Sequence, residues 1–151
     1  MGVLKNMITV AIVSRRLKEG KTYEDFRKAW FHTVGFGSKN KMFSILNASD
    51  PREIIVIGLT EMTHEDLMSK LMIDVKERLS NPLDDVIEPE INRKFGLLVS
   101  EDNFSAEGSI AYKPAAVDGK PTDLVQINHE LAELAQLIVQ ASAVRDSNKK
   151  P

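Results

Sequence analysis

Two stretches decide the fold, Met7-Ile-Thr-Val-Ala-Ile-Val13 and Glu53-Ile-Ile-Val-Ile-Gly-Leu-Thr60. Both are rich in β-branched residues, which favour strands because their restricted χ1 angles suit a pleated surface. Neither alternates between apolar and polar residues, as a strand with one face in water would. The two stretches therefore predict strands that are buried on both faces.

Two helices and two further strands are predicted around these stretches. Thr22 with Asp25, and Thr63 with Asp66, have the spacing of a helix N-cap that is bonded back by an acidic residue. Each pair precedes apolar residues at spacings of three and four, as in an amphipathic helix. Apolar runs at 41–47 and 95–99 predict the other strands. The resulting order, β-α-β-β-α-β, predicts an α+β fold with a ferredoxin-like antiparallel sheet.

The chain is expected to divide into a ferredoxin-like domain at 1–104, an irregular connector at 105–121 and a C-terminal helix at 122–145. Glycine and proline mark the connector, and Thr122 is the expected N-cap of the helix. Apolar residues of this helix alternate between spacings of three and four, which indicates a heptad-like seam. These are Leu124, Ile127, Leu131, Leu134, Ile138 and Ala141.

Strands that are apolar on both faces need a covering layer on each side of the sheet. Two helices can cover one side. A second copy of the sheet, related by a two-fold axis, would cover the other, so a homodimer through the sheet faces is predicted. The alternative is that the C-terminal helix covers the second face within one chain; the same helix could also pack across the dimer.

Composition excludes several classes of function. The 151 residues include 20 Lys and Arg, 22 Asp and Glu, and no Cys. Without cysteine there is no disulfide framework, thiolate zinc site, iron–sulfur cluster or cysteine nucleophile. The near-neutral charge argues against nucleic-acid binding. No apolar stretch is long enough for a membrane span and the N-terminus lacks a signal-peptide pattern, so a cytoplasmic protein is expected. Neither metal-ligand spacing nor a cofactor-binding loop is present, and no metal or cofactor is predicted.

The residues Arg15-Arg-Leu-Lys18 at the end of a strand, followed by Thr22-Tyr-Glu-Asp-Phe-Arg-Lys-Ala-Trp30, resemble the dimeric α+β barrel superfamily. The resemblance is greatest to its EthD-like and NIPSNAP-like members and covers residues 7–100. It implies two ferredoxin-like protomers whose sheets form a shared barrel. It also implies small-molecule chemistry, which in this superfamily includes cofactor-free oxygenation and isomerisation.

Two residues are candidates for catalysis. His32 could act as a general acid or base, because histidine titrates near neutral pH. Arg15 and Arg16 leave a strand on opposite faces, and one of them could hold a carboxylate or an enolate; Arg16 is chosen here. The simpler alternatives are an exposed histidine near a helix C-terminus and solvated charges at a strand end.

Four residues are candidates for binding a small apolar ligand. Trp30, Phe36 and Met42 could wall a pocket beneath the first helix, and Tyr112 could fold over it as a lid. Trp30 could equally be a core anchor between helix and sheet. Together with the aromatic residues of the first helix, the family resemblance implies a small enzyme acting on an apolar or aromatic metabolite by proton transfer or cofactor-free oxygenation. The alternative is a non-catalytic ligand-binding or protein-interaction module.

Overall fold

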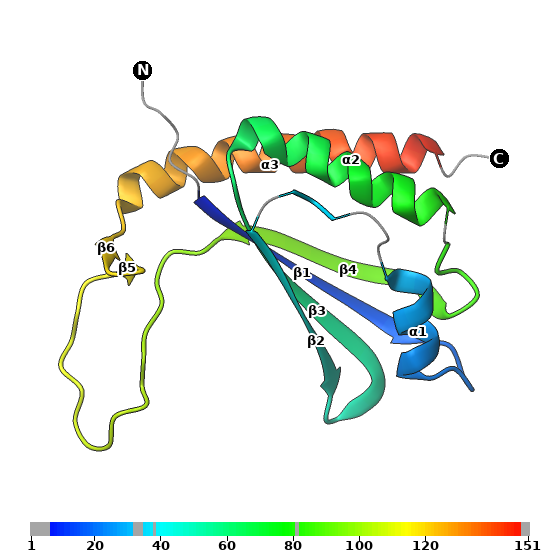
Figure 1. The fold of residues 1–151 in the computed structure, drawn as a ribbon, viewed down its shortest axis with the longest axis horizontal. Coiled ribbons are helices and arrows are strands. Elements are labelled where there is room, and N and C mark those ends of the chain that lie inside the picture. The colour runs from blue at the N-terminus through cyan, green and yellow to red at the C-terminus, as the bar shows by residue number, and fades with distance from the viewer. Residues whose placement is uncertain (1–6, 32–34, 38, 81, 149–151) are drawn as a thin grey trace.

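Four antiparallel strands form the main sheet, in the order β2-β3-β1-β4 (Figure 1). This computed structural model describes residues 7–31, 35–37, 39–80 and 82–148. The α+β class, the antiparallel sheet and the C-terminal helix predicted from the sequence are confirmed, and the two deciding stretches lie in the central strands. The strands are β1 (Met7–Leu17), β2 (Lys39–Asn47), β3 (Asp50–Met62) and β4 (Ile87–Leu97).

The helices are α1 (Tyr23–Trp30), α2 (His64–Ser80) and α3 (Leu124–Asn148). The predicted caps of the first two are present. The backbone N–H of Asp25 donates to Thr22 Oγ1 at 3.2 Å, and that of Asp66 donates to Thr63 Oγ1 at 3.3 Å. These bonds satisfy backbone donors that lack partners in the first helical turn.

The predicted cap of α3 is wrong by one residue. Asp123 Oδ1 accepts the backbone N–H groups of Val125 and Gln126 at 3.0 and 3.1 Å. Thr122 instead donates its hydroxyl to the carbonyl of Val99 at 2.7 Å. Aspartate caps a helix as well as threonine does, so Thr122 is left to tie the start of α3 to the end of the sheet.

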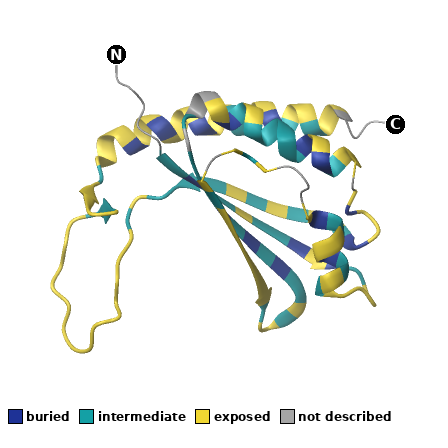
Figure 2. Cartoon of the chain, in the orientation of Figure 1, coloured by how far each residue is buried: buried dark blue, intermediate teal, exposed yellow. Residues whose placement is uncertain are grey.

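All three helices lie over the same face of the sheet (Figure 1). α2 and α3 run side by side and pack Leu67 against Leu134, with Leu97 of β4 beneath them. α1 packs Phe26 and Trp30 into the core at the end of β1. Figure 2 shows the buried positions of the helices among their exposed outer positions. We call this side of the sheet the covered face.

The opposite side, which we call the open face, has no covering layer in the part of the chain that the structure describes. Cross-strand partners share a face, and Ile57 of β3 lies between Ile12 and Phe43. Ile12 is 38% exposed and Phe43 51% exposed, although both are large apolar residues. The C-terminal helix therefore does not cover this face within one chain.

β4 is longer than predicted, since it begins at Ile87 rather than at residue 95. Among the described strands it pairs only with β1, at the edge of the sheet. Polar and charged residues and Pro89 interrupt its apolar pattern, and an edge strand tolerates a proline because one side of its backbone is unpaired. Because of these features, the sequence pattern did not predict the first half of the strand.

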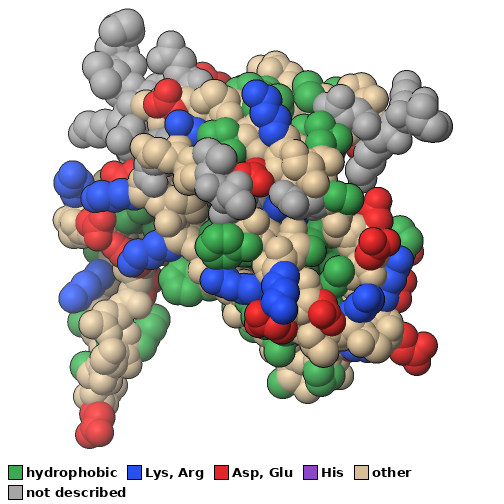
Figure 3. All heavy atoms as spheres, turned by 45° about the vertical axis from the view of Figure 1, so that its right-hand side comes forward, with side chains coloured by type: hydrophobic (Ala, Val, Ile, Leu, Met, Phe, Trp, Pro, Cys, Tyr) green, Lys and Arg blue, Asp and Glu red, His purple; other side chains and the backbone are tan. Residues whose placement is uncertain are grey.

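An arm, residues 98–121, projects from the body of the molecule (Figures 2 and 3). Most of it is irregular, but it includes the short strands β5 (Ala116–Val117) and β6 (Lys120–Pro121). Asp118 and Gly119 join them with positive φ angles of 51° and 74°, as a two-residue hairpin turn requires. Among the described helices, none has the length and apolarity to cross a membrane.

Candidate functional site

A cavity of about 130 Å³ lies between the covered face and helices α2 and α3. It exists because small residues meet in the central strands: Gly58 of β3 lies opposite Ala11 of β1. On its other side Gly58 pairs with Met42 of β2, whose side chain reaches over it. A Cβ atom at position 58 would lie 2.7 Å from Met42 Sδ, so the glycine leaves room for the methionine. These residues form the floor of the cavity.

Three of the predicted ligand-binding residues, Trp30, Phe36 and Met42, line this one cavity. Trp30 also stacks on the fully buried Phe26, with ring centroids 5.8 Å apart, so it is both a core anchor and a cavity wall. Its position is further fixed by Arg78 of α2, which donates to the Trp30 carbonyl at 2.7 Å. The end of α1 is thereby held against the cavity.

Strand alternation separates the two candidate arginines. Arg15 is on the covered face, lines the cavity and is 8% exposed. Arg16 is on the open face, where its Nε donates to Asp50 Oδ2 at 3.0 Å and holds the pKa of that carboxyl below its usual range. Arg16 is the candidate predicted from the sequence, but the structure places Arg15 in the cavity wall.

Arg15 is a buried cation in a crowded positive environment. Burial lowers its pKa to about 10; Asp74 counteracts this shift, and Arg93 adds to it. At neutral pH the side chain is still charged. Its guanidinium lies 5.8 Å from the centroid of the Phe26 ring. Arg15 Nε has no hydrogen-bond partner among the described residues.

Other polar groups of the cavity are also unsatisfied. Thr9 Oγ1, Asn40 Oδ1 and Arg145 Nε are buried without a hydrogen-bond partner in the described part of the chain, and all three residues line the cavity. Buried polar atoms are normally bonded to protein or to water. Their convergence on one apolar cavity is typical of a binding site rather than of a sealed core.

Sequence reasoning missed the charged residues that the helices and β4 bring to the cavity, namely Lys70, Asp74, Arg93 and Arg145. The helical spacing carried a signal for two of them. Asp74 follows Leu71 by three positions and Arg145 follows Ala141 by four, so each continues the apolar face of its helix. A charged residue at such an inward position marks a polar site within the core.

The remaining predicted site residues lie elsewhere. Tyr112 is in the arm, 91% exposed, and does not line the cavity. His32 lies outside the described residues. Within those residues, no three His, Asp or Glu side chains are grouped so that they could hold a metal ion.

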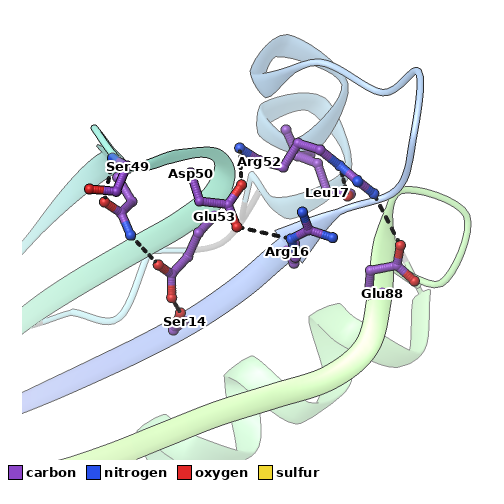
Figure 4. Close-up of polar contacts among 9 residues, drawn as sticks. Ser14, Arg16, Leu17, Ser49, Asp50, Arg52, Glu53 and Glu88 are labelled. Carbon is purple, nitrogen blue, oxygen red and sulfur yellow. Dashed lines mark hydrogen bonds and ion pairs between the residues drawn. The ribbon is translucent and has the colours of Figure 1, made fainter.

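A second polar cluster closes the end of the sheet on the open face (Figure 4). Glu53 accepts hydrogen bonds from the Ser14 hydroxyl and, at 2.6 Å, from Asn47 Nδ2; these bonds lower the pKa of its carboxyl. Arg52 bridges to Glu88 at 3.2 Å. A wide groove of about 710 Å³ runs along the cluster. Because these charged groups bind one another, we assign the cluster a structural role in closing the β2–β3 hairpin and not a ligand-binding role.

The cavity on the covered face is therefore the candidate site. No protein-family model, curated protein or solved structure matches the chain.

Proposed function

We propose that the protein is a homodimeric small-molecule enzyme of the dimeric α+β barrel type. Its substrate is an apolar or aromatic metabolite, and its reaction is proton transfer or cofactor-free oxygenation. The observation that carries the proposal is the buried Arg15 in a cavity walled by Trp30, Phe36 and Met42. An apolar cavity with a few convergent polar groups is the usual form of a small-molecule site.

Arg15 has the chemistry that such a reaction needs. Removing a proton from a carbon beside a carbonyl leaves an enolate, whose negative oxygen needs a positioned donor. A buried guanidinium in an apolar cavity provides that donor without having to reorganise. In this scheme Arg15 takes the role that the sequence suggested for Arg16, and His32 accepts the proton. The assignment of His32 rests on its residue type, because histidine can act as a general base near neutral pH.

The order β1-α1-β2-β3-α2-β4 and the open face support a ferredoxin-like protomer that pairs through its sheet. An uncovered sheet with apolar residues on its central strands is rare in monomers. A two-fold axis would place the open face of one copy against that of its partner. In this arrangement the covered face, with its cavity, stays on the outside of each protomer's sheet.

The second candidate function is a protein-interaction module. It is favoured by exposed apolar residues on the outer side of α3, where Val125 is 70% and Val139 69% exposed. In that case a partner would bind along α3. Catalysis would then be absent.

Turnover of small carbonyl acids and phenols tests the proposal. Deuterium incorporation in heavy water reports proton transfer, and oxygen consumption reports oxygenation. For a compound that is turned over, we expect Arg15→Gln to lower kcat by about 100-fold, the usual effect of removing a donor to a developing oxyanion. Arg27→Gln, an equal charge change on the exposed side of α1, should leave kcat unchanged. Equal activity of Arg15→Gln and wild type would contradict the role of Arg15.

A further inference from the structure

The cavity carries more positive charge than its own acidic groups balance. Four cationic side chains line it, from β1, α2, β4 and α3, whereas Asp74 is the single acidic side chain among its described lining residues. The cationic residues are Arg15, Lys70, Arg93 and Arg145. Burying like charges together is costly unless an opposite charge joins them.

Two of these arginines are neighbours on the covered face. Arg93 of β4 pairs with Val13 of β1, and Arg15 follows Val13 by two residues, so both side chains leave the sheet on the same side. Burial lowers the pKa of Arg93 and the nearby Arg145 lowers it further, while Asp74 and Asp146 partly offset the shift. Arg145 donates through one terminal nitrogen to Ser142 Oγ at 3.1 Å, while its Nε stays without a described partner. The site therefore has guanidinium donors in excess.

We propose that the cavity binds a small apolar carboxylic acid as its anion, with the carboxylate on Arg15 and Arg93 and the apolar part against Trp30 and Phe36. This inference rests on the proposed function, because it assigns the substrate class of the same cavity. It goes further by requiring the ligand to carry a full negative charge when it binds.

The size and shape of the site restrict the ligand. Its volume of about 130 Å³ is close to the roughly 150 Å³ of an engineered cavity that takes up benzene. One ring or a short branched chain fits such a space. The planar guanidinium fork matches the two oxygens of a carboxylate, with two parallel hydrogen bonds. A neutral ligand without an acceptor would leave the Nε–H of Arg15 unsatisfied in an apolar wall, and an alcohol could accept that bond but would not balance the charge.

Paired probes test the inference on the full chain. Benzoate and benzyl alcohol have the same ring, but only benzoate is charged. Trp30 is the sole tryptophan and lines the cavity, so its fluorescence reports binding of either probe. We expect wild type to bind benzoate at least about tenfold more tightly, as is typical of hydrogen bonds to a charged group. Arg15→Gln and Arg93→Gln should each reduce this preference about tenfold, whereas Arg27→Gln should keep it.

Binding of benzyl alcohol shows that a variant still folds. If Arg15→Gln does not fold, the benzoate preference of Arg93→Gln tests the inference. Equal affinity of wild type for the two probes would overturn the anion inference and leave the proposed apolar ligand site standing. A preference for benzoate that survives in both variants would overturn the assignment to these arginines. If neither probe binds, the inference and the proposed ligand site both fail.

Discussion

The covered and open faces of the sheet are built by alternate residues of the same strands, yet they differ in what they contain. In β1, Ala11 and Arg15 lie on the covered face, and Ile12 lies between them on the open face. The covered face has small residues, the buried Arg15 and the partly buried Arg93 beneath the helices. The open face has large apolar residues and no covering layer among the described elements. In our proposal, the covered face binds a ligand and the open face binds a second copy of the chain.

The largest expected effect compares one substitution on the two sides of the sheet. Phe26 is fully buried beneath α1, and Phe43 lies on the open face. Phe26→Ala should lower the free energy of unfolding by about 3–5 kcal/mol at every protein concentration, because it leaves a cavity in the core. The cost of Phe43→Ala should be small in dilute protein and grow with concentration, since its burial depends on the partner. Urea unfolding at several concentrations measures both; a concentration-independent cost for Phe43→Ala would count against the interface.

The next effect concerns the proposed dimer. Ile12→Lys places a charge at the centre of the open face and should weaken association by about 100-fold, as loss of an interface hot spot does. Val139→Lys makes the same chemical change on the exposed side of α3 and should have no effect. Sedimentation equilibrium at micromolar concentration distinguishes the two. Dissociation by Val139→Lys alone would favour α3 as the contact surface.

A smaller effect is expected from a matched pair of glycines. Gly58 lies on the covered face and Gly96, the partner of Val10, lies on the open face. Gly58→Ala would push Met42 into the cavity and should weaken benzyl alcohol binding about tenfold, while stability changes by about 1 kcal/mol or less, because the methionine end is flexible. A Cβ at Gly96 meets no atom within 4 Å, so Gly96→Ala should leave binding unchanged. Trp30 fluorescence measures the affinity. If wild type, Gly58→Ala and Gly96→Ala bind benzyl alcohol equally tightly, the ligand does not occupy this cavity.

The smallest effect is a pH dependence at the end of the open face. Hydrogen bonds from Ser14 and Asn47 hold the pKa of Glu53 below its ordinary value of 4.5. A carboxyl whose pKa is lower in the folded state stabilises the fold above the unfolded pKa, and this contribution disappears as the pH falls through the folded pKa. As the pH falls below about 4.5, the free energy of unfolding should therefore decrease less in Glu53→Gln than in wild type. Urea unfolding midpoints measured from neutral to acid pH report this difference. If the midpoints of the two proteins fall identically with pH, Glu53 makes no such contribution.

The sequence predicted what depends on local physics. β-branched runs located β1 and β3, and the Thr–Asp spacings located the starts of α1 and α2. It assigned the site to Arg16 rather than to Arg15, because strand alternation puts the two on opposite faces without saying which face the helices cover. The first half of β4 escaped because its charges and Pro89 mask an edge strand. The cavity depends on side-chain sizes from several elements, and no single stretch records it.

Adjacent residues of β2 provide the most direct test of the two-face account. Met42 is 42% exposed and lines the cavity, and Phe43 points to the open face. Hydroxyl-radical footprinting with mass spectrometry reads the oxidation of both in one sample. The radical dose is matched between samples with a dosimeter, because benzoate and protein both consume hydroxyl radicals. At matched dose we predict that benzoate slows oxidation of Met42 but not of Phe43, and that a higher protein concentration slows oxidation of Phe43 but not of Met42. If both residues respond to both changes, or neither responds to either, the division of the sheet into a ligand face and a partner face is wrong.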